Sequence, residues 1–163
     1  MCGQVALAME HISNLGLVHR DLAARNVVLS PMLDVKVASL ALSRDVYVNE
    51  YFLFQQHLIP LRWMSPEAIL DGEFSAESDV WSYGVFAWEV FTSGDLPLAH
   101  RTNEQVLEGL NSKENLLPCP LGCPNDIWSL IQTCLADCPQ DRPSFSDIVT
   151  LVYDILSDGV YSS

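Results

Sequence analysis

The sequence predicts a mainly α-helical domain that carries one short β-hairpin in its N-terminal part. The chain has 163 residues, enough for one domain with a hydrophobic core and too few for two ordinary ones. Hydrophobic residues make up 49% of the chain and charged residues 18%, a composition typical of globular proteins. Apolar residues recur at helical spacing near the N-terminus and again after residue 67, and two short strand-like runs lie between these parts.

The N-terminal elements are a helix and the hairpin. A helix is predicted from about residue 4 to residue 15, ending near Gly16, because one face carries Val5, Ala8, Met9 and Ile12. Two strand-like runs, 27–29 and 35–38, flank a turn at 30–34. Residues 39–67 show no regular pattern and are expected to be irregular.

The C-terminal elements are helices with recognisable start signals. Ser75 can cap a helix whose body, residues 79–91, is apolar nearly all round, which predicts a buried central helix. The capping box of Thr102 and Gln105 predicts a short helix after it. Two more helices are predicted, one through Ile127, Leu130, Ile131 and Leu135 and a last one that Ser144 opens.

The charge of the chain excludes several classes of partner. Its net charge is -13, from 8 Lys and Arg against 21 Asp and Glu, which argues against nucleic acids and anionic membrane surfaces. The longest apolar stretch, 80–91, contains Ser82, Gly84 and Glu89 and is too short to span a membrane. The N-terminal residues lack a basic region and make a poor signal peptide.

The five cysteines predict thiols rather than a metal site. They lie at positions 2, 119, 123, 134 and 138, so two pairs have C-x3-C spacing. This spacing is looser than the usual C-x2-C of zinc sites, and no histidine lies nearby. We therefore expect buried or free thiols in a reducing compartment, and no metal.

Residues 19–26 carry the most specific motif of the chain. They read His-Arg-Asp-Leu-Ala-Ala-Arg-Asn, which matches the H-R-D-L-x-x-x-N catalytic loop of protein kinases, with an interior typical of tyrosine kinases. In an active kinase the aspartate, here Asp21, accepts the proton of the substrate hydroxyl, and the asparagine, here Asn26, holds magnesium. Arg25 belongs to the same loop and is a third candidate catalytic residue.

The next kinase motif is degenerate. Ser39-Leu40-Ala41 stands where Asp-Phe-Gly should bind magnesium and so contribute to nucleotide binding. Ser39 is neutral and is a poor magnesium ligand, since magnesium prefers hard, anionic oxygens. No glycine-rich loop or strand lysine precedes the catalytic loop in this chain, so we expect the N-lobe to be absent. No cofactor is therefore expected, although active relatives use ATP and Mg.

Three further signatures follow in the order seen in tyrosine kinases, at 60–67, 78–84 and 141–145. With the catalytic loop, they make the chain resemble the C-terminal lobe of the protein kinase-like fold. The resemblance implies a tyrosine kinase-like domain over 1–157, with an activation segment at 39–67 and a tail at 158–163.

Within this family the chain most resembles the receptor pseudokinases of the protein tyrosine kinase seven, or off-track, group. Residues 4–7, 9–11, 13–14 and 63–70 carry that resemblance. It implies a single-pass receptor with immunoglobulin-like ectodomains that acts in Wnt and planar polarity signalling, with this domain on the cytoplasmic side of the plasma membrane. The chain as it stands would be soluble and cytoplasmic. Its implied partners are signalling proteins or another receptor's kinase domain.

The resemblance also implies structural roles. His19 would pack against Leu40, Asp79 would accept hydrogen bonds from the catalytic-loop backbone, and Glu67 would pair with Arg142. Leu135 departs from the Cys-Trp that the family usually has at 134–135, which puts the packing there in doubt.

Two tyrosines, Tyr47 and Tyr51, lie where activation-loop phosphorylation sites occur, where a phosphate could face Arg20. They could equally be half-buried aromatic residues. The helix at 103–110 and the loop at 118–124 could dock partners or simply be solvated.

These observations favour a catalytically inactive, tyrosine kinase-like signalling module that acts through protein–protein interactions. Asp21, Arg25 and Asn26 keep a second hypothesis open, a fragment of an active ATP-dependent tyrosine kinase. A passive fragment that neither binds nor catalyses is the third.

Overall fold

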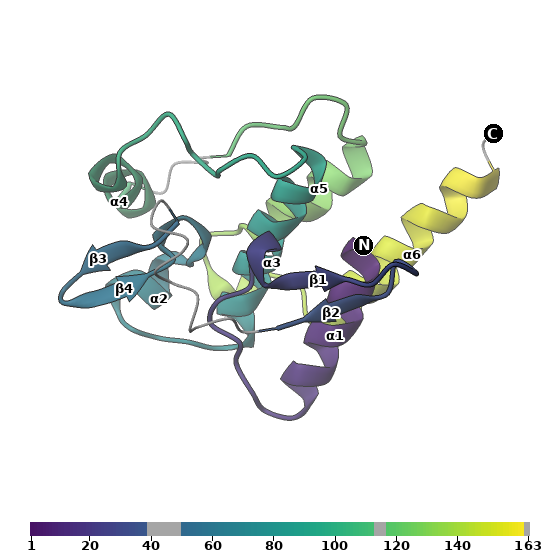
Figure 1. The fold of residues 1–163 in the computed structure, drawn as a ribbon, viewed down its shortest axis with the longest axis horizontal. Coiled ribbons are helices and arrows are strands. Elements are labelled where there is room, and N and C mark those ends of the chain that lie inside the picture. The colour runs from purple at the N-terminus through teal and green to yellow at the C-terminus, as the bar shows by residue number, and fades with distance from the viewer. Residues whose placement is uncertain (39–49, 113–116, 162–163) are drawn as a thin grey trace.

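The structure is a computed structural model that describes residues 1–38, 50–112 and 117–161 (Figure 1). Its α-helices are α1 (Cys2–Asn14), α2 (Pro66–Leu70), α3 (Ala76–Phe91), α4 (Asn103–Asn111), α5 (Asn125–Cys134) and α6 (Phe145–Tyr161). The 3-10 helices of the described residues are η1 (Ala24–Asn26), η3 (Leu61–Trp63) and η4 (Pro139–Asp141). The prediction of a mainly α-helical domain is confirmed.

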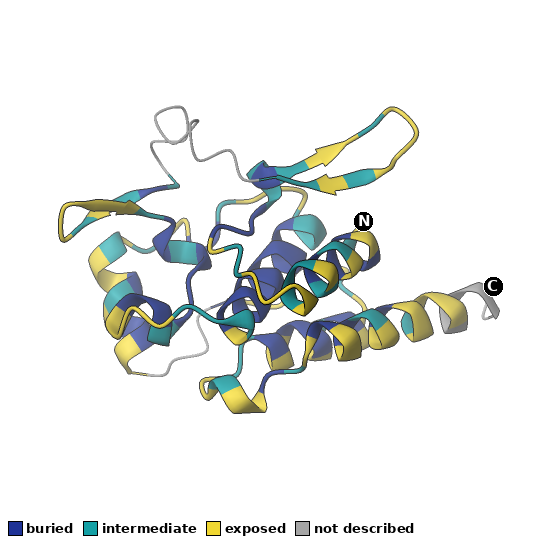
Figure 2. Cartoon of the chain, turned by 90° about the horizontal axis from the view of Figure 1, so that it is seen from below, coloured by how far each residue is buried: buried dark blue, intermediate teal, exposed yellow. Residues whose placement is uncertain are grey.

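Helix α3 forms the centre of the domain. Its start is fixed locally, because the backbone N–H of Ser78 donates to Ser75 Oγ (3.3 Å) and the Ser75 N–H donates to Ser78 Oγ (3.0 Å). Helices α1 and α5 pack against it, and α6 packs on α1 and α5. Buried residues therefore run along almost its whole length (Figure 2), as expected from its apolar sequence.

A glycine allows α5 to approach α3 closely. A Cβ atom added at Gly84 would lie 2.9 Å from Cys134 Cβ and 3.2 Å from Leu135 Cγ, so no side chain fits there without movement. This contact holds the end of α5, and Leu135 directly after it, against the central helix.

Two antiparallel hairpins complete the part of the fold that the structure describes. The predicted one pairs β1 (Val27–Leu29) with β2 (Val35–Val37). The other pairs β3 (Phe52–Phe54) with β4 (His57–Ile59), within a region expected to be irregular, so that expectation is wrong. Its turn residues Gln55 and Gln56 adopt φ values of 45° and 70°. Two-residue turns of this kind usually contain Asn or Gly. Because neither residue is present at 55–56, the sequence did not indicate the hairpin.

The predicted capping box of α4 is also present, since Gln105 N–H donates to Thr102 Oγ1 (3.3 Å) and Thr102 N–H donates to Gln105 Oε1 (2.9 Å). The last helix continues to Tyr161, past the boundary proposed at residue 157. The division into a domain and a tail at that residue therefore stays a prediction.

Candidate active site

The backbone of the loop at 19–26 is held by a buried carboxylate on α3. The N–H groups of His19 and Arg20 donate to Asp79 Oδ2 (2.7 Å) and Oδ1 (2.9 Å). These two bonds stabilise Arg20 at φ 68°, a conformation uncommon for a residue other than glycine. Burial raises the pKa of Asp79, although the two N–H groups counteract part of that effect. Asp79 thus accepts hydrogen bonds from the backbone of the catalytic loop, which is the role that the resemblance implied.

His19 connects this loop to the end of the first hairpin. Its Nε2 lies 3.2 Å from the carbonyl oxygen of Ala38, and its Nδ1 accepts the N–H of Asp21 (3.3 Å). Ala38 N–H also donates to the carbonyl of Asn26 (2.8 Å). The predicted packing of His19 against Leu40 lies outside the described residues.

Both carboxylate oxygens of Asp21 are bound by side chains of the chain itself. Arg25 Nη2 lies 2.5 Å from Oδ1, and the hydroxyl of Tyr51 donates to Oδ2 at 2.6 Å. Asp21 is 5% exposed and Tyr51 is 8% exposed, so the cluster excludes bulk water. The position that a substrate hydroxyl would need at Asp21 is therefore filled by Tyr51.

Arg25 is packed between aromatic rings. The central carbon of its guanidinium lies 4.7 Å from the ring centroid of Tyr51 and 4.3 Å from that of Trp63. Burial by itself would lower the pKa of Arg25, but attraction to Asp21 and the hydrogen bond to Tyr51 outweigh it and raise the pKa. Burial and the bond to Asp21 raise the pKa of Tyr51, which keeps the phenol neutral.

This geometry also bears on phosphorylation of Tyr51. The cation beside its ring is Arg25, whereas the Arg20 guanidinium lies 4.9 Å from the ring centroid of Phe74. The expectation that a phosphate would face Arg20 stays a prediction. Tyr47 lies outside the described residues.

Glu89 is a buried carboxylate of the site that the sequence analysis did not recognise. Its Oε2 accepts the N–H of Ala24 and the indole N–H of Trp63, both at 2.9 Å. Burial raises its pKa, with these donors acting in the opposite direction. Glu89 thus joins α3 to the catalytic loop and to η3. A lone glutamate in the apolar 79–91 stretch was the one signal that could have revealed it.

A second arginine–carboxylate pair lies away from the loop. Arg142 Nη1 and Nη2 donate to Glu67 Oε1 (2.6 Å) and Oε2 (2.9 Å). The other N–H groups of Arg142 donate to the carbonyls of Ala136, Glu77 and Asp137. Burial opposes ionisation of Glu67, but the bonds from Arg142 outweigh it and lower its pKa. The pair expected from the resemblance is therefore formed, and it joins α2 to the turn before α6.

The order of these elements places the chain among known proteins. It matches the family model described as "Protein tyrosine and serine/threonine kinase" over residues 1–152. The chain belongs to this kinase family. It is 54% identical to "Inactive tyrosine-protein kinase 7" of Gallus gallus over 158 residues, which make up 97% of this chain and 15% of the relative. The Homo sapiens protein of that name is 52% identical, with the same coverage.

Other receptors are less similar to this chain. The "Insulin-like growth factor 1 receptor" of Xenopus laevis is 39% identical over 160 residues, covering 98% of this chain and 12% of that receptor. The chain therefore spans about 15% of the length of the inactive relatives that it matches. The predicted resemblance to the protein tyrosine kinase seven group and the predicted C-lobe fold are confirmed.

Asn26 and Asp21 both bind other groups of the chain in this structure. The amide Nδ2 of Asn26 donates to the carbonyl of Asp21 (2.6 Å), and the carboxylate of Asp21 is bound by Arg25 and Tyr51. Within the described ranges, no three His, Cys, Asp or Glu side chains come together as a metal site. Ser39 and its neighbours fall outside these ranges, so their predicted part in nucleotide binding stays a prediction.

The cysteines are free thiols, with Cys134 buried and Cys119 and Cys138 exposed. Burial raises the pKa of Cys134 to about 12, so its thiol stays protonated. None of the described helices is both long enough and apolar enough to cross a membrane.

Proposed function

We propose that this domain is a pseudokinase module of a receptor-type protein and that it works by binding other proteins rather than by phosphoryl transfer. The observation that carries the proposal is the occupation of Asp21, whose two carboxylate oxygens are bound by Arg25 and Tyr51. The substitution of the Asp-Phe-Gly motif by Ser39-Leu40-Ala41 supports it independently, because a neutral serine is a poor ligand for magnesium. The inactive relatives support it as well.

The resemblance to the protein tyrosine kinase seven group supports a proposal for the surroundings of the domain. We place it on the cytoplasmic side of a single-pass receptor in the plasma membrane, acting in Wnt and planar polarity signalling. Its partners would be signalling proteins or the kinase domain of another receptor. The net charge of -13 favours partners that present basic surfaces.

Tyr47 and Tyr51 remain candidate phosphorylation sites within this proposal. The hydroxyl of Tyr51 is accessible to another kinase only after it leaves Asp21. A phosphate on Tyr51 would then be repelled by the Asp21 carboxylate and would keep the residue outside the site.

The test is phosphoryl transfer by the complete receptor, purified from cells, with and without the substitution Asp21→Asn. We expect transfer to a tyrosine substrate to be at background for both proteins, because neither can place a substrate hydroxyl and magnesium together. Transfer above background that Asp21→Asn abolishes would overturn the proposal and favour an active tyrosine kinase. A Lys36→Ala receptor, changed at an exposed strand residue, controls for expression and folding.

A further inference from the structure

A groove lies between α5 and α6 on the surface of the domain. Ser129, Leu130 and Thr133 line it from α5, and Leu151 and Ile155 line it from α6. Residues spaced by three or four lie on the same face of a helix, so each wall is one continuous helical face. Leu130 is 6% exposed and closes the floor, whereas Leu151 is 44% exposed. The groove therefore presents apolar side chains that no element of the described chain covers.

Each wall of the groove also carries a carboxylate, Asp126 on α5 and Asp154 on α6. Both are exposed, and neither has a salt bridge or a side-chain hydrogen bond within the described part of the chain. Residues 117–157 contain five aspartates and one basic residue, Arg142, which is buried and bound to Glu67. Helix α1, which packs on α6, contains no lysine or arginine either. The groove therefore lies in a negative potential that no basic side chain of these helices offsets.

This charge selects among the partners that an uncovered apolar groove could bind. Nucleic acids and anionic membrane surfaces are repelled. A second copy of this chain is disfavoured as well, because each copy has a net charge of -13. A segment that places lysine or arginine beside apolar side chains complements both the carboxylates and the leucines of the walls. Two helices that pack side by side form a groove in which a third helix can lay its apolar face.

We propose that the groove between α5 and α6 binds an amphipathic α-helix of another protein, one whose apolar face is flanked by lysine or arginine. Apolar side chains of that helix pack on Leu151 and Ile155, and its basic side chains lie against Asp126 and Asp154. The inference rests on the function proposed above, because it names a surface through which the domain binds a partner. Its test involves no phosphoryl transfer, so a failure at this surface is distinct from a failure of the proposed lack of catalysis.

The probe is a peptide of about 14 residues, four helical turns, with leucine at helical spacing on one face and lysine at the other positions. In ¹⁵N–¹H spectra of the full chain, we expect it to shift the backbone resonances of Ser129, Thr133 and Asp154. The resonances of α4 should stay unchanged, because α4 and α6 lie on opposite sides of the domain (Figure 1). A peptide with glutamate in place of lysine should not bind, since like charges repel. A peptide with serine in place of leucine should bind about tenfold more weakly.

Paired variants separate this groove from a general attraction between opposite charges. Asp154→Lys should weaken binding of the lysine peptide about tenfold, whereas Glu108→Lys, the same charge change at an exposed position of α4, should change it by at most about twofold. Leu151→Asp should also weaken binding about tenfold, and Leu53→Asp, at an exposed position of β3, is its control. The proposal is overturned if the peptide shifts no resonance of α5 or α6 at millimolar concentration. It is also overturned if Glu108→Lys weakens binding as much as Asp154→Lys does.

Discussion

Two arginine–carboxylate pairs lie within the described part of this domain, and their hydrogen bonding differs. Arg142 donates all of its N–H groups, to both oxygens of Glu67 and to three backbone carbonyls. Arg25 binds Asp21 and Tyr51, but within the described part of the chain its Nη1 is buried without a partner. A fully satisfied buried network stabilises one arrangement, whereas a partly satisfied one stabilises it less. The Glu67–Arg142 pair is therefore the more strongly fixed of the two.

The sharpest test of this difference is the removal of Arg142. Arg142→Ala should lower the free energy of unfolding by about 3–5 kcal/mol, because it leaves the Glu67 carboxylate and three carbonyls without donors. Urea denaturation measures the loss. Lys36→Ala, at an exposed position, should stay within about 0.5 kcal/mol of the parent chain. A loss below about 1 kcal/mol for Arg142→Ala would contradict the structural role of the pair.

The next effect concerns the support of the catalytic loop. Asp79→Ala should cost about 2–3 kcal/mol, since it removes a charged acceptor from the buried N–H groups of His19 and Arg20. Amide hydrogen exchange at these two residues should accelerate along with the loss of stability. Asp71→Ala, at an exposed carboxylate after α2, is the control and should change neither. Unchanged exchange in Asp79→Ala would show that the loop is held by other contacts.

A smaller effect is expected at the former catalytic centre. Tyr51→Phe should cost about 1 kcal/mol, because it removes the bond to Asp21 and the one from Arg25 but keeps the ring between its neighbours. Tyr153→Phe, on the exposed side of α6, should have no measurable effect in the same denaturation experiment. If Tyr51→Phe were as damaging as Arg142→Ala, the two pairs would not differ in the way proposed here.

The smallest effect is a difference in pH dependence between two buried glutamates. The pKa of Glu67 is lowered in the folded state, so its ionised form stabilises the fold above about pH 4.3, and this contribution disappears as the pH falls through the folded pKa. Glu67→Gln should therefore have a lower free energy of unfolding than the parent chain at neutral pH, and this difference should shrink in acid.

The pKa of Glu89 is raised by burial, so its contribution is complete below its ordinary pKa and is lost as the pH rises through the folded value. The free energy of unfolding of Glu89→Gln should therefore increase relative to that of the parent chain as the pH rises. Denaturation curves between pH 3 and pH 8 measure both trends, and parallel trends for the two variants would refute the assignment.

The sequence by itself determined the elements that depend on near neighbours. The capping boxes at Ser75 and Thr102 join residues three apart, and the apolar character of 79–91 follows from its own side chains. The order of the kinase signatures was also readable, since it needs no knowledge of contacts. Together these features were enough to predict the helical C-lobe fold.

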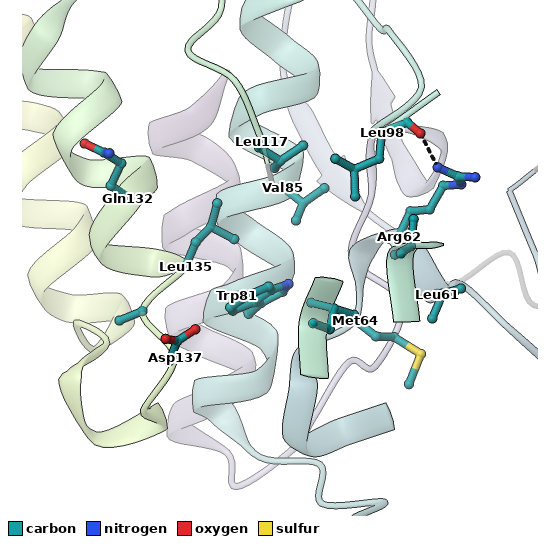
Figure 3. Close-up of a pocket in the computed structure, with 13 residues that line it drawn as sticks. Leu61, Arg62, Met64, Trp81, Val85, Leu98, Leu117, Gln132, Leu135 and Asp137 are labelled. Atoms are coloured by element: carbon teal, nitrogen blue, oxygen red, sulfur yellow. Dashed lines mark hydrogen bonds between the residues drawn. The ribbon is translucent and has the colours of Figure 1, made fainter. Parts of the chain in front are cut away.

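Tertiary structure decided the contacts between residues far apart in the chain. Tyr51 meets Asp21 across 30 residues, and Trp63 meets Glu89 across 26. No local pattern in a single sequence encodes such distances, because they depend on how the helices pack. The same holds for the burial of Trp81, which depends on the elements that pack around it on one side of α3 (Figure 3).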